Sequence, residues 1–400
     1  MTDEVELRRR EYDARIRAAR LRQEAFASDD GGSGLDDLVA AERELADLAG
    51  RSAAARTGEA VVLDTRPSGD TLGPASTGIG VVERIRMRHL PTAFCHLLEA
   101  RLNPLVSVTL RRYRPKETRR LRVSCAVDGY SATAVETVEL DTAEARTVDL
   151  LPTFHPAALA AVTELTRATL GLQVEDLDGP RTEVHRTTPI WLLARDTAPF
   201  QTLDPATGAM TDLTRYLGAF VTPHAPEVVE FTRRVADRHP ERRLMGYQGT
   251  REAVEAQVRA VYEAVAEDLG LTYVNSAIAF NPEEGAAGQR VRLPRESLRN
   301  GVGNCLDGTV LLASLLENLS LRPEIVLVPG HALVGWEDWP DLGTWSHLDT
   351  TVAGGFERAV RRAAGIVSRY EAGQAATGDT TLLRRWPIRD LRAAGITPMG

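Results

Sequence analysis

Cysteine is scarce in this sequence, and its few cysteines lie far apart. The 400-residue chain has three of them, Cys95, Cys125 and Cys305. A disulfide framework or a zinc site needs cysteines or histidines at short, paired spacings, and these three residues do not provide them. We therefore expect no bound metal, no cofactor and thiols that stay reduced.

Long apolar runs and basic clusters are also missing. No stretch reaches the roughly 18 uninterrupted apolar residues that suggest a membrane-spanning helix, and the N-terminal MTDEVELRRREYDARIRAAR lacks the apolar core of a signal peptide. The formal net charge is −8, and lysine is scarce among the 48 basic residues. No clustered acidic loop indicates activation by calcium. We expect a cytoplasmic protein that binds neither nucleic acid nor membrane.

The sequence pattern divides the chain into four segments and predicts the α+β class. Residues 1–50 predict an N-terminal helical hairpin, which docks on a partner, self-associates, packs on the body of the protein or is partly disordered. Residues 51–83, rich in small and turn-forming residues, predict a linker. Residues 84–200 contain short strands of period two and predict a β-sandwich accessory domain. Residues 215–400 form the last predicted domain, which ends in a helical tail.

The last domain contains the residues with the clearest chemistry. Gly303 and Asn304 precede a long apolar-periodic run, which predicts a helix. Asn304 is a natural N-cap, and Asp307 completes a pair similar to a capping box. Cys305 then occupies the first helical position, where free N–H groups and the helix dipole favour a thiolate.

Two predicted strands after this helix carry a base and an acid. Residues 325–328 are β-branched and apolar, and Pro329 and Gly330 separate them from His331. Residues 345–351 alternate like another strand and include Asp349. Adjacent antiparallel strands can place the two side chains together, so that the acid orients the imidazole and the imidazole deprotonates the thiol.

These residues resemble the motifs of the transglutaminase-like superfamily, a group of papain-fold cysteine enzymes. The similarity lies in Gly303-Asn-Cys-Leu-Asp307, Gly330-His-Ala332 and Leu348-Asp-Thr-Thr351. The bacterial branch is the most similar, because it too has a Gln-Arg-Val-Arg-x-Pro stretch upstream, which begins here at Gln289. The resemblance covers roughly residues 215 to 351.

The resemblance implies a papain/transglutaminase-like catalytic domain with a triad of Cys305, His331 and Asp349. It also raises Gln289 as a candidate residue on the oxyanion side of the site. The implied partner is a protein or peptide substrate. Animal transglutaminases have tryptophan where this chain has Leu306 and Leu333, which favours hydrolysis over acyl transfer to an amine.

The residues themselves leave alternatives open. His347 is a rival base, because it lies on the same strand face as Asp349. The backbone N–H of Cys305 is an alternative oxyanion donor to Gln289. The carboxylate of Asp307 caps the helix but opposes thiolate formation so close to the sulfur.

We therefore expect a cysteine hydrolase, a peptidase or amidase, in which Cys305 forms an acyl-enzyme and His331 transfers the protons. A protein-crosslinking transglutaminase that uses the same triad is one alternative. The other is a non-catalytic binding or scaffold protein in which the site is a vestige.

Overall fold

The computed structural model describes residues 79–399 except 113–117, 143, 180, 204–209, 240, 275–287 and 353, together with scattered positions between 7 and 48. The described chain contains helices and several sheets, which confirms the mixed α+β class. Its contacts divide it into two compact units. The sheet unit comprises Ala53–Asp212 and Asn281–Gly288, and the site unit comprises Met1–Ser52, Leu213–Phe280 and Gln289–Gly400.

The N-terminal predictions fall largely outside the described residues. The helical hairpin over residues 1–50 lies outside them apart from the scattered positions, and so does most of the linker over 51–83. A strand begins at Ile79, inside the stretch predicted as linker. Ile79 and Val81 are buried strand residues.

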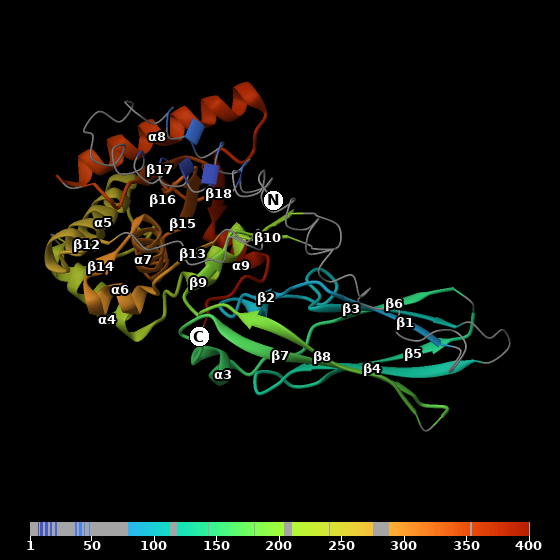
Figure 1. Ribbon diagram of the computed structural model, residues 1–400. Coiled ribbons are helices and arrows are strands. Elements are labelled where there is room, and N and C mark those ends of the chain that lie inside the picture. The colour runs from blue at the N-terminus through green and yellow to red at the C-terminus, as the bar shows by residue number, and fades with distance from the viewer. Residues whose placement is uncertain are drawn as a thin grey trace. The chain divides into compact units, whose positions relative to one another are not determined.

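The sheet unit contains two larger sheets (Figure 1). One has three strands in the order β1-β3-β6, and the other has five in the order β2-β8-β7-β4-β5. In β4, alternate residues from Leu121 to Val127 are buried, which is the period of a strand with one covered face. Strand β6 contacts β4 and β5 of the other sheet, so the two sheets pack together.

The elements of the sheet unit are β1 (Ile79–Ile85), β2 (His89–Leu90), η1 (Cys95–Leu97), β3 (Val106–Arg112), β4 (Arg119–Val127), β5 (Ala134–Leu140), β6 (Arg146–Leu150), α3 (Pro156–Ala160), β7 (Thr166–Asp176), β8 (Arg181–Leu192), β9 (Thr197–Pro199), β10 (Gln201–Leu203) and β11 (Met210–Asp212).

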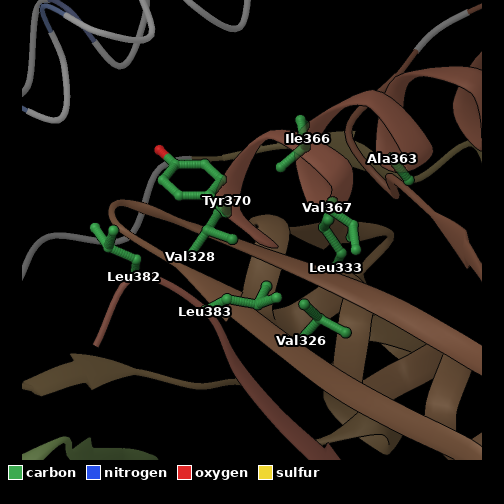
Figure 2. Packing of buried hydrophobic residues seen from close by; sticks show 9 residues of the cluster. All are labelled: Val326, Val328, Leu333, Ala363, Ile366, Val367, Tyr370, Leu382 and Leu383. Atoms are coloured by element: carbon green, nitrogen blue, oxygen red, sulfur yellow. The ribbon is translucent and has the colours of Figure 1, made fainter. Parts of the chain in front are cut away.

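The site unit is organised around a four-stranded antiparallel sheet in the order β17-β16-β15-β18. Helix α7 contacts β15 and β16, and helix α8 contacts β17. Figure 2 shows how α8 is fixed: Ala363, Ile366, Val367 and Tyr370 of the helix share a buried apolar cluster with Val326, Val328 and Leu333 of the sheet and with Leu382 and Leu383. Their spacing along α8 places them on one helical face.

The elements of the site unit are η2 (Thr214–Phe220), α4 (Pro226–Arg238), α5 (Arg251–Glu263), η3 (Ala264–Asp268), β12 (Thr272–Tyr273), β13 (Gly288–Arg290, whose first residue belongs to the sheet unit), α6 (Pro294–Asn300), β14 (Val302–Gly303), α7 (Cys305–Asn318), β15 (Pro323–Val328), β16 (His331–Glu337), β17 (Trp345–Leu348), α8 (Phe356–Thr377), β18 (Arg384–Pro387) and α9 (Ile388–Ala393).

The C-terminal tail differs from the helical tail that the sequence predicts. Between α8 and α9 it contains strand β18, which pairs with β15. An exposed strand edge leaves backbone hydrogen-bonding groups without partners, and β18 covers that edge of β15. None of the described helices is long and apolar enough to cross a membrane.

Candidate functional site

The nucleophile candidate begins helix α7, as its sequence predicts. The side chain of Asn304 caps the helix by accepting hydrogen bonds from the N–H groups of Leu306 (2.8 Å) and Asp307 (2.9 Å). The carboxylate of Asp307 accepts a hydrogen bond from the N–H of Asn304 (2.9 Å), which completes the predicted capping box. Cys305 is therefore the first residue of a firmly capped helix.

Asp307 is fully buried and is neutralised by an arginine from the Gln-Arg-Val-Arg-x-Pro stretch. It accepts hydrogen bonds from the backbone N–H of Arg292 (2.7 Å) and from its Nη1 (2.7 Å). Burial raises the pKa of Asp307, although the bonds from Asn304 and Arg292 act in the opposite direction. The nearby guanidinium reduces the repulsion that a lone carboxylate would exert on a thiolate at Cys305.

Cys305, His331 and Asp349 come together from three elements. Cys305 begins α7, His331 begins β16, and Asp349 directly follows β17. Nε2 of His331 lies 3.1 Å from Oδ2 of Asp349, and the imidazole also interacts with the thiol of Cys305. Because Nε2 faces the acid, Nδ1 is the nitrogen left to face the sulfur. The exposed fractions of the three residues are 7%, 7% and 0%.

Burial and charge act in opposite directions on the base and the acid. Burial lowers the pKa of His331, but the charge and hydrogen bonding of Asp349, with further contributions from Cys305, raise it to about 10. Burial raises the pKa of Asp349, but His331 and Thr351 together lower it to about 2. At neutral pH the pair is therefore an imidazolium and a carboxylate, which places a positive charge beside the sulfur of Cys305.

A glycine of α7 allows the acid segment to approach the nucleophile helix. The hydroxyl of Thr350 donates to the carbonyl oxygen of Cys305 at 3.4 Å. A Cβ atom at Gly308 would come within 2.5 Å of that same hydroxyl oxygen. Gly308 is thus required for the close contact between α7 and the residues around Asp349.

The rival base, His347, has a different partner. Its Nε2 lies 2.9 Å from Oε1 of the fully buried Glu324, which also accepts hydrogen bonds from Arg385. His347 and Glu324 come together across Gly335, where a Cβ atom would come within 2.9 Å of both side chains. Sequence spacing placed His347 near Asp349, whereas strand register brings it to Glu324.

The two candidate oxyanion donors differ in their surroundings. Gln289 lies half-buried in β13, and no hydrogen bond joins its side chain to Cys305, His331 or Asp349. The backbone N–H of Cys305 has no hydrogen-bond acceptor among the residues that the structure describes. Because that N–H group belongs to the residue that carries the sulfur, it lies next to the sulfur and is available as a candidate oxyanion donor.

Two contacts of Asp349 were not predicted from the sequence. Its Oδ1 accepts hydrogen bonds from the backbone N–H (2.9 Å) and hydroxyl (2.7 Å) of Thr351. Nε of Arg362, on α8, lies 3.1 Å from its Oδ2. The threonine could have been found from the Asp-x-Thr spacing, which allows a local side-chain turn. No local pattern relates Arg362 to Asp349.

Within the described part of the chain, no group of His, Cys, Asp and Glu residues is arranged to hold a metal ion. No known protein-family model matches the chain, and a search of curated proteins finds no match either.

Proposed function

We propose that this protein is a cysteine-nucleophile acyl-transfer enzyme, a peptidase or amidase that uses Cys305, His331 and Asp349. One observation carries the proposal: a buried imidazole lies between a cysteine at a capped helix start and an ionised carboxylate. A core histidine needs one hydrogen-bond partner at each nitrogen, but it does not need a thiol on one side and a buried acid on the other. That combination is the arrangement that activates a sulfur nucleophile.

In the first half of the reaction, the thiolate of Cys305 attacks the carbonyl carbon of the substrate. The tetrahedral intermediate collapses when the imidazolium of His331 gives its proton to the leaving amine, which leaves a thioester on Cys305. His331 is then neutral and can remove a proton from water as the water attacks the thioester. The acid product leaves, and the thiolate and imidazolium are restored.

The oxyanion of the intermediate needs a donor close to the sulfur. The backbone N–H of Cys305 fulfils this condition, because it has no acceptor among the described residues and lies at the positive end of α7. Gln289 remains a candidate for a second donor only through the resemblance of its sequence context.

The motifs around Cys305, His331 and Asp349 also support a place in the transglutaminase-like superfamily, with a papain-fold domain order and a protein or peptide substrate. In this proposal the sheet unit is an accessory domain that recognises the substrate, and the enzyme works in the cytoplasm. No cofactor takes part, because the nucleophile, the base and the acid are all side chains of the chain itself.

The proposal is tested with an activated ester and intact-protein mass spectrometry. Wild-type protein should gain one acyl group, and Cys305→Ala should gain none under the same conditions. The acyl group should then be lost to water at a rate that an added primary amine does not change. Faster loss with transfer to the amine would instead identify a transglutaminase. Absence of acylation in folded wild-type protein would favour a binding protein.

A further inference from the structure

An arginine from a distant helix shares the carboxylate that faces the proposed catalytic base. Nε of Arg362 lies 3.1 Å from Oδ2 of Asp349, the same oxygen that lies 3.1 Å from Nε2 of His331. The side chain of Arg362 is 14% exposed and that of Asp349 is fully buried. Two basic side chains therefore meet at a single carboxylate oxygen in a largely buried part of the site.

Helix α8 holds this arginine in a fixed position. Ala363, the next residue, belongs to the apolar cluster that packs α8 against the sheet (Figure 2). The carbonyl oxygen of Ala359, one turn earlier, accepts a hydrogen bond from the backbone N–H of Asp349 at 3.3 Å. The helix thus contacts the acid through its backbone as well as through Arg362.

We propose that Arg362 is a positioning residue of the site, which orients Asp349 toward His331 and places a fixed positive charge behind the acid. This inference rests on the proposed function, because it concerns the reactivity of the same cysteine. The positive charge opposes the protonated form of His331 and favours the thiolate of the nucleophile. It therefore sets the pH range in which the site is reactive.

The reaction requires such a balance. His331 must hold a proton to release the leaving group and must be neutral to activate water in the next step. A buried acid alone would hold the imidazole in its protonated form, and a nearby guanidinium offsets part of that attraction. Among the described residues, the other charged or titratable groups near the site include the ion pair of Asp307 with Arg292 on the α7 side and the phenol of Tyr262 on α5.

Loss of the guanidinium should move the reactive range to higher pH. Without the guanidinium, the imidazolium of His331 is more stable and the thiolate of Cys305 is less stable. Each of the two residues should therefore lose its proton at a higher pH. A charge within about 4–6 Å typically shifts a titration by about one unit or more. A purely structural arginine would change stability without such a shift.

The test measures the initial rate of iodoacetamide alkylation of Cys305 against pH, with each cysteine followed by peptide mass spectrometry. Arg362→Gln should move the midpoint of the profile to higher pH by about one unit. Arg362→Lys, which retains the charge, should stay near the wild-type midpoint. Arg361→Gln is the matched control, because Arg361 is exposed on the same helix, and it should leave the profile unchanged.

A profile of Arg362→Gln that superposes on the wild-type profile would overturn the inference. If this variant does not fold, the double variant Asp349→Asn/Arg362→Gln is compared with Asp349→Asn alone. The double variant removes the charges of Asp349 and Arg362 together, so neither of these two charges is left buried without the other. The midpoint should again move to higher pH, and an unchanged midpoint there overturns the inference as well. If Cys305 of the wild type is no more reactive than Cys95 and Cys125, the proposed function fails rather than the role of Arg362.

Discussion

At the scale of single residues, the proposed site depends on one carboxylate with several partners. Asp349 faces His331 and Arg362 through Oδ2 and accepts two hydrogen bonds from Thr351 through Oδ1. Burial raises the pKa of Asp349, but the contacts with His331 and Thr351 lower it and keep the acid ionised. The ionised acid in turn holds a proton on the imidazole beside the sulfur.

The first prediction separates the two histidines by role. His331→Ala should slow alkylation of Cys305 at neutral pH, because the thiolate loses the imidazolium that stabilises it. His347→Ala should leave this rate nearly unchanged, because His347 pairs with Glu324. Alkylation rates of the folded variants provide the measurement, and the reverse pattern would transfer the role of base to His347.

The second prediction concerns stability and pH. The pKa of Asp349 is lowered to about 2. The contribution of this carboxylate to the free energy of unfolding is therefore present above about pH 4 and is lost as the pH falls toward 2. The pKa of His331 is raised from 6.5 to about 10. The contribution of this imidazolium to the free energy of unfolding is therefore complete below about pH 6.5 and is lost as the pH rises through 10. The pair therefore stabilises the fold most between about pH 4 and 6.5.

Asp349→Asn should accordingly lower the free energy of unfolding more at about pH 5 than at about pH 10. Urea denaturation of wild type and variant at the two pH values measures the difference. An equal loss at both would mean that the ion pair does not carry the stabilisation.

At the scale of elements, the start of α7 is tied to two other segments. The buried ion pair between Asp307 and Arg292 joins it to the chain before α6. Thr350 joins it to the segment that follows β17. Removing one partner of a buried ion pair destabilises the fold, whereas the intact pair adds little net stability. The clearest effect of the pair between Asp307 and Arg292 is therefore to fix the position of the start of α7.

The third prediction tests the close approach at Gly308. Gly308→Ala would bring a Cβ atom against the hydroxyl of Thr350 and push the acid segment away from Cys305. We expect a loss of roughly 1–3 kcal/mol in the free energy of unfolding, as for overpacking, and slower alkylation of Cys305.

Gly365→Ala is the matched control for that change. Gly365 is exposed within α8, and a Cβ atom there would meet nothing within 4 Å. Because alanine is the better helix former, this variant should be equally or more stable, by up to about 1 kcal/mol. If Gly308→Ala behaves like this control, the contact between α7 and Thr350 does not position the acid.

At the scale of the whole molecule, the two compact units suggest that the site can fold without the larger sheets. The fourth prediction is that a fragment beginning near residue 205, which lacks the Met1–Ser52 part of the site unit, stays folded and retains a reactive Cys305. The fragment should lose activity mainly toward the natural substrate. Circular dichroism and alkylation of the fragment are the measurements, and an insoluble fragment would mean that the sheet unit or the Met1–Ser52 segment completes the core of the site unit.

The parts of the molecule that were predicted from the sequence are those determined by nearby residues. The start of α7 followed from Asn304 and Asp307, and the strands that carry His331 and precede Asp349 followed from apolar runs and turn residues. These signals act within one helical turn or along one strand, so a sequence contains them directly.

The remaining features depend on contacts between distant segments. The periodicity of α8 indicates which side packs on the sheet, but not that Arg362 meets Asp349. Likewise, the register of β15, β16 and β17 determines that His347 faces Glu324, and no local pattern specifies a register across three strands. Strand β18 was missed because its pairing partner, β15, precedes it by a whole helix.

The most direct test of a nucleophilic Cys305 is competition among the three cysteines of the folded protein. Cys95 donates its thiol to the carbonyl oxygen of Pro91, and burial raises its pKa, while burial raises the pKa of Cys125 to about 12. Limiting iodoacetamide at neutral pH should therefore label Cys305 faster than either of the others, by roughly tenfold or more. Equal labelling of all three cysteines in the folded protein would contradict the account.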